Sequence, residues 1–63
     1  MFLAERKVAD FISSNPYEVV ELNVSDLADK SGASDATVIR LCKRLGYKGF
    51  YQMKLALAEE LGR

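Results

Sequence analysis

Residues 24–43 decide the fold of this chain, and they read VSDLADKSGASDATVIRLCK. Gly32 divides the stretch into two segments of helical periodicity, and glycine permits the left-handed backbone of a sharp turn. Ala28 stands four residues earlier, where two helices that cross at about 90–120° must approach each other closely. Val38 and Leu41 share one face of the second segment and can pack against the first. This spacing predicts a helix-turn-helix.

Polar residues mark where these two helices begin. Asn23 is the expected N-cap of the first, with Asp26 at the third helical position, and Ser25 is a competing cap. Ser34 is the expected cap of the second. Gly46 ends the second helix after an apolar face formed by Val38, Leu41, Cys42 and Leu45. The second helix is therefore expected over about residues 34–45.

The periodicity is helical along the rest of the chain as well. Asn15 and Pro16 begin a new short helix, because Asn is a preferred cap and Pro suits the first helical position. A last helix runs from about Phe50 to Leu61. The expected fold is all-α, a small homeodomain-like bundle of about five helices that forms one domain over residues 1–63.

The first and last helices carry apolar stripes. In the first helix the expected buried positions are Val8, Phe11 and Ile12, with Ala4 or Glu5 a turn earlier. The last helix has a core stripe of Phe50, Met53, Leu57 and Leu61, and a second stripe on another face. The second stripe comprises Tyr51, Leu55 and Ala58. It is either an interface with another copy or another domain, or an ordinary scatter of exposed apolar residues.

Charge is distributed unevenly, although the formal net charge is zero. Residues 1–35 carry seven acidic and three basic side chains, a net charge of −4, whereas residues 36–58 carry five basic side chains and no acidic one. Such asymmetry suggests that one surface faces a polyanion. An ordinary solvated helix face is the alternative.

The exposed face expected for helix 34–45 suits double-stranded DNA. In a helix-turn-helix the N-terminal part of the second helix meets base edges in the major groove. Arg40 can donate two hydrogen bonds to guanine, and the methyl groups of Ala36 and Thr37 suit thymine. Ser34 can help to hold a phosphate at the helix start, and the later cations suit backbone phosphates. The predicted DNA-binding residues are Ser34, Ala36, Thr37, Arg40, Lys43, Arg44 and Lys48.

Other roles stay open for several of these side chains. Arg40 can contact a phosphate or water, Thr37 can bond to a carbonyl of its own helix, and Ser34 can act as a cap alone. Asp35 suits the positive end of the helix dipole better than it suits a base. Tyr47 either contacts DNA or packs after Gly46.

Composition argues against catalysis and metal binding. The chain has no His, and its single cysteine, Cys42, falls on an apolar helix face. Zinc needs about four N, S or O ligands, and a chain this short offers no pocket in which a carboxylate pair can act. We expect no enzymatic activity, no cofactor and no metal. The chief alternative to DNA binding is a helical protein–protein interaction module.

No apolar run approaches the ~20 residues of a membrane span. The N-terminal MFLA has no cationic flank and no cleavage site, so no signal peptide is expected. A cytoplasmic location without membrane contact is the expectation.

The motif residues resemble a known family. Three features are similar to the N-terminal DNA-binding domain of the RpiR family of bacterial transcriptional regulators. They are LA in the first motif helix, SG-x-S-x-A-T-V-x-R through the turn, and the run LGYKGF. ERKVADFISSNP resembles the first helix of that family. The resemblance implies sequence-specific binding to operator DNA, assembly into dimers or higher oligomers, and a C-terminal sugar isomerase-like (SIS) domain that binds a phosphosugar effector. Since residues 1–63 contain no such domain, an N-terminal fragment of a longer regulator is expected.

Overall fold

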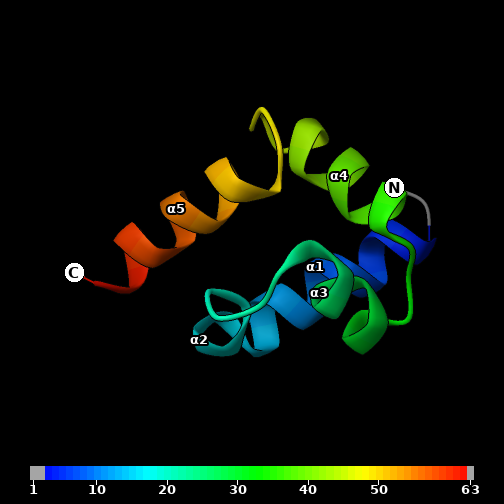
Figure 1. Ribbon diagram of the computed structural model, residues 1–63, viewed down its shortest axis with the longest axis horizontal. Helices are drawn as coiled ribbons and strands as arrows, with labels where there is room; N and C mark the ends of the chain where they lie inside the picture. The colour runs from blue at the N-terminus through cyan, green and yellow to red at the C-terminus, as the bar shows by residue number, and fades with distance from the viewer. Residues whose placement is uncertain (1–2, 63) are drawn as a thin grey trace.

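Five helices make up the part of the chain that the structure describes. The computed structural model describes residues 3–62, with the order α1 (Leu3–Ser14), α2 (Pro16–Val19), α3 (Val24–Ser31), α4 (Asp35–Arg44) and α5 (Phe50–Leu61) (Figure 1). Met1 and Phe2 of the MFLA stretch lie outside the described residues, as does Arg63. The prediction of an all-α bundle of about five helices is confirmed.

The helix-turn-helix consists of α3 and α4, and the predicted caps and glycine turn are present in it. The Asn23 side chain accepts a hydrogen bond of 2.8 Å from the Asp26 N–H, so Asn23 and not Ser25 caps α3. Gly32 adopts a left-handed backbone with φ of 75°. Ser34 caps α4 by accepting a 3.2 Å bond from the Thr37 N–H. Each cap satisfies a backbone donor that the helix itself leaves unpaired.

The end of α4 has the same kind of turn as the end of α3. Gly46 has a φ of 98°. The Tyr47 N–H donates to the Cys42 carbonyl at 3.0 Å, and the Gly46 N–H donates to the Lys43 carbonyl at 3.0 Å. This pair of bonds is a Schellman motif, which satisfies carbonyls of the last helical turn. The predicted stop at Gly46 is confirmed.

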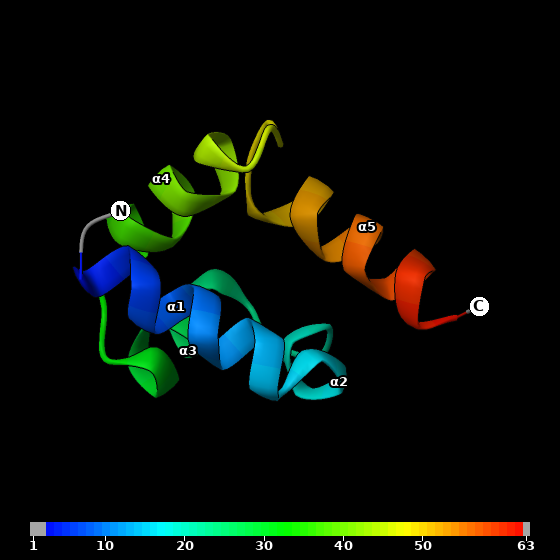
Figure 2. The same ribbon diagram turned by 180° about the vertical axis from the view of Figure 1, so that it is seen from behind.

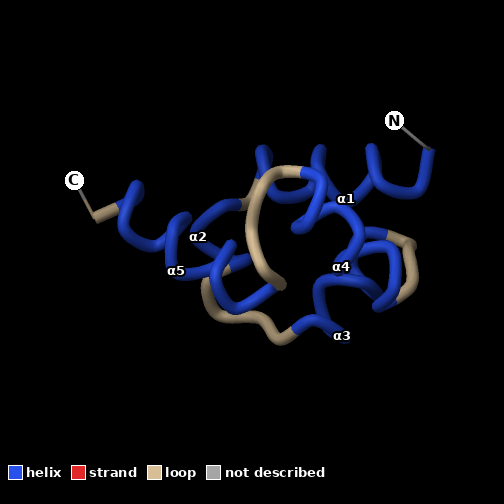
Figure 3. Tube along the Cα trace, turned by 90° about the horizontal axis from the view of Figure 1, so that it is seen from above, coloured by secondary structure: helices blue, strands red, loops and turns tan. Residues whose placement is uncertain are grey.

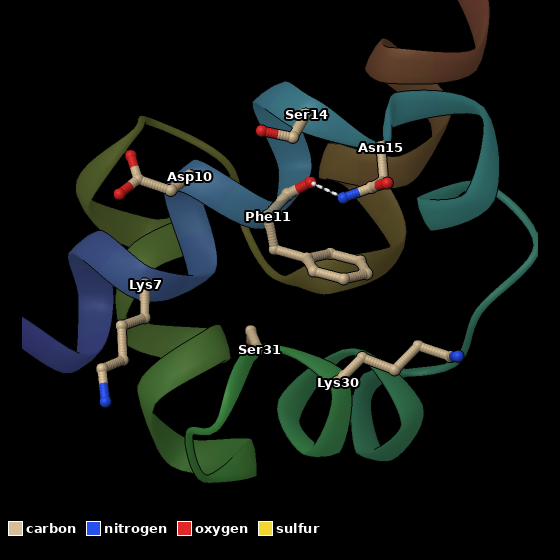
Figure 4. A pocket seen from close by; sticks show the side chains of 7 residues that line it. All are labelled: Lys7, Asp10, Phe11, Ser14, Asn15, Lys30 and Ser31. Atoms are coloured by element: carbon tan, nitrogen blue, oxygen red, sulfur yellow. Dashed lines mark hydrogen bonds between the residues drawn. The ribbon is translucent and has the colours of Figure 1, made fainter.

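Asn15 does not use its side chain as the predicted cap of α2. Pro16 does occupy the first helical position, but the Asn15 side chain makes no capping bond there. Its Nδ2 instead donates to the Phe11 carbonyl at 3.2 Å and so satisfies the end of α1 (Figure 4). The Asn15 side chain therefore bonds to the C-terminal end of α1 and does not cap α2.

The core lies where α1, α3 and α4 meet, and α2 and α5 complete it. Its buried apolar members are Val8, Val19, Leu27, Ala28, Val38, Leu41, Cys42 and Met53. Glu5 is also fully buried, whereas Ala4 is half-buried. The prediction that Leu45 joins this core is wrong, because Leu45 is 53% exposed. It follows the last residue of α4 and borders an open hollow of about 310 Å³ between α4 and α5.

α5 extends away from the group formed by α1, α3 and α4, and its C-terminal end lies far from them (Figures 1 and 2). It lies beside α2, with which it is in contact (Figure 3). Lys54 fixes this arrangement, because its Nζ donates to the Leu22 carbonyl at 3.0 Å and lies 5.5 Å from the centre of the Phe50 ring. The hydrogen bond gives Lys54 a structural role in the bundle.

Candidate nucleic-acid interface

The packing of α4 determines which of its side chains reach solvent. One face of the helix packs into the core, and it carries Val38, Leu41 and Cys42. The residues on the opposite face are exposed, among them Ala36, Arg40 and Lys43. Ser34 at the helix start, Arg44 at its end and Lys48 in the following loop are exposed as well. Six of the seven predicted DNA-binding residues are therefore accessible.

Thr37 is the exception. Its residue surface is only 4% exposed, so the prediction that it lies on the outer face of the helix is wrong. Thr37 stands seven residues before Arg44 and thus on the same side of α4. That side faces α1, because Arg44 pairs with Glu5 of α1. The flank occupied by Thr37 is covered, whereas the face of Ala36 and Arg40 is open.

Hydrogen bonds link Thr37 to its polar neighbours at the start of α4. The hydroxyls of Ser34 and Thr37 share a bond of 2.9 Å. Arg40 Nη2 donates to Thr37 Oγ1 at 3.3 Å. The guanidinium of Arg40 is therefore drawn toward the N-terminal end of the helix, the end that meets base edges in helix-turn-helix proteins. Thr37 thereby restrains the Arg40 side chain.

The acidic residue at the start of α4 is bonded within the motif. Ser25 donates from its hydroxyl to Asp35 Oδ2 at 3.0 Å, which joins the first turns of α3 and α4. Asp35 lies in the first turn of α4, where a negative charge is favoured by the helix dipole. From Ala36 to the end of α4 the exposed face carries only basic charges.

Arg44 occupies the last turn of α4 and reaches back to α1. Its Nε donates to Glu5 Oε1 at 2.8 Å. The Arg44 side chain is 51% exposed, whereas the Glu5 side chain is fully buried. Sequence patterns placed Glu5 as one of two choices for the buried stripe of α1, but they did not indicate this partner.

A second surface feature, which no residue of α4 lines, has no comparable organisation. A shallow hollow of about 340 Å³ lies between the C-terminal ends of α1 and α3 (Figure 4). Its two lysines, Lys7 and Lys30, point away from each other (Figure 4). Lys30 also pairs with Glu18 at 3.1 Å. Since the cations do not converge, this hollow is a poor anion site.

Comparison with known proteins decides the family. The sequence profile of the family described as "Helix-turn-helix domain, rpiR family" matches residues 1–63. The chain belongs to the RpiR family. The prediction from the TVIR and LGYKGF residues is thereby confirmed.

Similar proteins agree with the RpiR assignment. The chain is 43% identical over 60 residues to YbbH of Bacillus subtilis (strain 168), an "uncharacterized HTH-type transcriptional regulator", with 95% of this chain and 21% of the relative covered. Over 58 residues it is 38% identical to the HTH-type transcriptional regulator HexR of Pseudomonas aeruginosa, which covers 92% of this chain and 20% of HexR. The chain thus spans about a fifth of the length of these relatives.

Solved structures show the same RpiR fold. The N-terminal domain of YbbH from Bacillus subtilis superposes with a TM-score of 0.97 at 41% identity, covering 100% of this chain and 77% of that one. The Vibrio vulnificus NanR protein, solved in complex with ManNAc-6P, superposes with a TM-score of 0.95 at 40% identity. That match covers 98% of this chain and 24% of NanR.

A similar sequence also occurs in a much longer relative that is named as a bifunctional protein. The bifunctional protein glk of Paraburkholderia xenovorans is 41% identical over 58 residues, which cover 92% of this chain and 9% of that protein.

In residues 3–62 of this chain, no group of three His, Cys, Asp or Glu side chains is placed to hold a metal ion. Burial raises the pKa of the Cys42 thiol, which disfavours the reactive thiolate.

None of the helices between Leu3 and Leu61 has both the length and the apolar character that crossing a membrane requires.

Proposed function

We propose that this chain is the DNA-reading domain of a bacterial transcriptional regulator, and that it binds operator DNA sequence-specifically with α4 in the major groove. The observation that carries this proposal is the outer face of α4, which is exposed, basic and free of acids beyond Asp35, within a helix-turn-helix of the RpiR family. Such a face suits the phosphates that line the groove as well as its base edges.

The side chains divide into two proposed roles. Ala36 and Arg40 are proposed to read base edges, and Thr37 is proposed to support this role through its bond to Arg40. Ser34, Lys43, Arg44 and Lys48 are placed for phosphates at the two ends of the helix. Base contacts supply the sequence preference, and phosphate contacts supply register and most of the salt-dependent affinity.

A titration with duplex DNA at several salt concentrations tests the proposal. Affinity should fall steeply with salt, because each neutralised phosphate releases counterions with a slope of about −0.9 in log K against log salt. A selected operator should bind more tightly than random duplex. Binding to a protein partner that is insensitive to salt, with no binding to DNA, would favour a protein–protein interaction module instead.

Lys48→Ala should weaken binding to all duplexes alike. Lys48 is exposed in the loop after α4, where a phosphate contact is favoured over a base contact. The salt slope should decrease in magnitude by ~0.9 if one phosphate contact is lost. Affinity for operator and for random duplex, each measured across a salt series, reports both quantities.

The matched control is Lys30→Ala, which also removes one positive charge but from a side chain that is held by Glu18 of α2. It should leave the salt slope unchanged. A loss confined to the operator after Lys48→Ala, with the slope intact, would assign Lys48 to base recognition and contradict its phosphate role.

We also propose that the full-length regulator is a dimer or higher oligomer and that α5 takes part in its assembly. Tyr51 and Leu55 are 63% and 52% exposed, and Ala58 on the same stripe is exposed too. Paired domains would place two α4 helices about one DNA turn, ~34 Å, apart on a palindromic operator. Two domains at this spacing would bind one operator together, so that both contribute contacts to a single binding event.

Leu55→Glu should shift the chain toward monomer without unfolding it. The substitution places a charge in the exposed stripe of α5, where it disfavours apolar association but removes no core contact. Analytical ultracentrifugation compares it with the wild type and with Leu3→Glu, a control at a 71% exposed leucine of α1. Identical sedimentation of all three proteins would remove α5 self-association from the proposal.

The effector is proposed to be a phosphosugar that binds a SIS domain outside residues 1–63. Support comes from NanR, a structural relative that was solved with ManNAc-6P and that extends well beyond the part matched here. The chain itself is proposed to have no enzymatic activity, since its curated relatives YbbH and HexR are transcriptional regulators. Regulation of bacterial genes would place it in the cytoplasm, where the DNA lies.

A further inference from the structure

Glu5 is an unusual residue in the core of so small a domain. Its side chain is fully buried in the first turn of α1. Within residues 3–62, Oε1 accepts the 2.8 Å bond from Arg44 Nε, whereas Oε2 is buried and has no hydrogen-bond partner. A buried carboxylate with one unsatisfied oxygen is costly. Stability alone therefore gives a poor reason for Glu5, because an apolar side chain of similar volume would fit this position with less cost.

Arg44 is held in one orientation by this bond. A guanidinium is planar and carries five N–H donors in a fixed arrangement. Glu5 accepts from Nε only, so the two terminal amino groups make no bond to it. The side chain is half exposed in the last turn of α4, the helix that carries Arg40 and Lys43 on its outer face.

We infer that Glu5 is a positioning residue for DNA binding: it fixes Arg44 through Nε so that the terminal amino groups of Arg44 meet a DNA phosphate. The inference rests on the proposed function. A phosphate cannot draw Arg44 away from α1 at low cost, because a buried carboxylate would then lose its counter-charge. Arg44 must therefore contact both groups at once, and its side chain is ordered before DNA arrives.

The negative charge of Glu5, considered alone, predicts that Glu5 weakens DNA binding, which is the opposite of a positioning role. Glu5 adds a negative charge near a surface that faces DNA, so its removal should strengthen binding by reducing repulsion. Two neutral replacements separate this effect from positioning. Glu5→Gln removes the charge but keeps an oxygen that can accept from Arg44 Nε, whereas Glu5→Leu removes both the charge and the acceptor. The difference between the two variants isolates the hydrogen bond.

The test measures duplex affinity across a salt series for the wild type, Glu5→Gln and Glu5→Leu. Glu5→Leu should bind more weakly than Glu5→Gln by about threefold or more, and the magnitude of its salt slope should be smaller by up to ~0.9, the value for one lost phosphate contact. Thermal unfolding should show that Glu5→Leu is no less stable than the wild type, since it removes the unsatisfied oxygen.

Arg44→Lys provides a second route in case Glu5→Leu fails to fold. Lysine keeps the charge, but a single ammonium cannot bond to Glu5 from one nitrogen and to a phosphate from two others. Arg44→Lys should therefore weaken binding to duplex DNA both in the wild-type chain and in the Glu5→Gln background, neither of which depends on the folding of Glu5→Leu.

Equal affinities and equal salt slopes for Glu5→Gln and Glu5→Leu would overturn the inference, as would an Arg44→Lys variant that binds like the wild type. Both results would leave Glu5 as a packing residue. If the wild type itself showed no salt-dependent binding to duplex DNA, the proposed function would fail first, and the two failures are thereby distinguished.

Discussion

Leu41→Ala should lower the free energy of unfolding by about 2–5 kcal/mol, because it removes buried methyl groups and leaves a cavity in the core. Leu41 is fully buried on the inner face of α4, among residues of α1 and α3. A domain of this length has a stability of only a few kcal/mol. Much of the protein should therefore be unfolded, as urea titration followed by circular dichroism would show.

Leu45→Ala is the matched control for that experiment. It removes the same atoms at the C-terminal end of the same helix, but Leu45 is 53% exposed and borders a hollow. Its effect should stay within about 0.5 kcal/mol, as for other surface substitutions. Equal losses at the two positions would mean that the end of α4 is packed as tightly as its middle, contrary to the structure.

Arg40→Ala should weaken binding to the operator by ~1–3 kcal/mol and relax the base preference at one position of each half-site. The side chain is exposed on the outer face of α4, and its bond to Thr37 directs it toward the start of the helix. A bidentate contact to guanine is lost when the guanidinium is removed. Selection of binding sites from a random duplex pool, with wild type and variant in parallel, measures the change in preference.

The control for Arg40→Ala is Arg6→Ala, which removes the same side chain from an exposed position of α1. It should leave the selected consensus unchanged and the operator affinity nearly so. If Arg40→Ala returned the wild-type consensus, Arg40 would be assigned to phosphate or solvent, and another residue of α4 would have to read the base.

Local signals in the sequence were enough to predict the helix-turn-helix. Asn23, Gly32 and Ser34 each act within a few residues, through a cap or a left-handed turn, and the structure shows all three as expected. Such features depend on backbone geometry nearby and hardly on the rest of the fold. The family resemblance uses this stretch together with LGYKGF and ERKVADFISSNP, and the family profile matches residues 1–63.

The errors at Thr37 and Leu45, and the missed partner of Glu5, arose where distant parts of the chain meet. Thr37 was placed on the outer face of α4, but the side of the helix that it shares with Arg44 is the side that faces α1. The bond between Glu5 and Arg44 joins residues 39 positions apart, which no periodicity within one helix can reveal. Leu45 kept the apolar spacing of α4, yet no neighbouring helix covers it fully at that end.

Gly32 and Gly46 form two corners of the fold, at the ends of α3 and α4. Glycine is required there by the left-handed backbone and not by a lack of space. A Cβ atom added to Gly32 or to Gly46 would meet no atom of residues 3–62 within 4 Å beyond the glycine itself and its two chain neighbours, so neither corner is crowded. The φ angles of 75° and 98° are nonetheless strained for an L-residue, because the side chain would approach its own carbonyl oxygen. A D-alanine has the mirror-image preference and would suit both corners. Because translation supplies only L-residues and glycine, glycine is the encoded residue that ends α3 and α4 at these corners without strain.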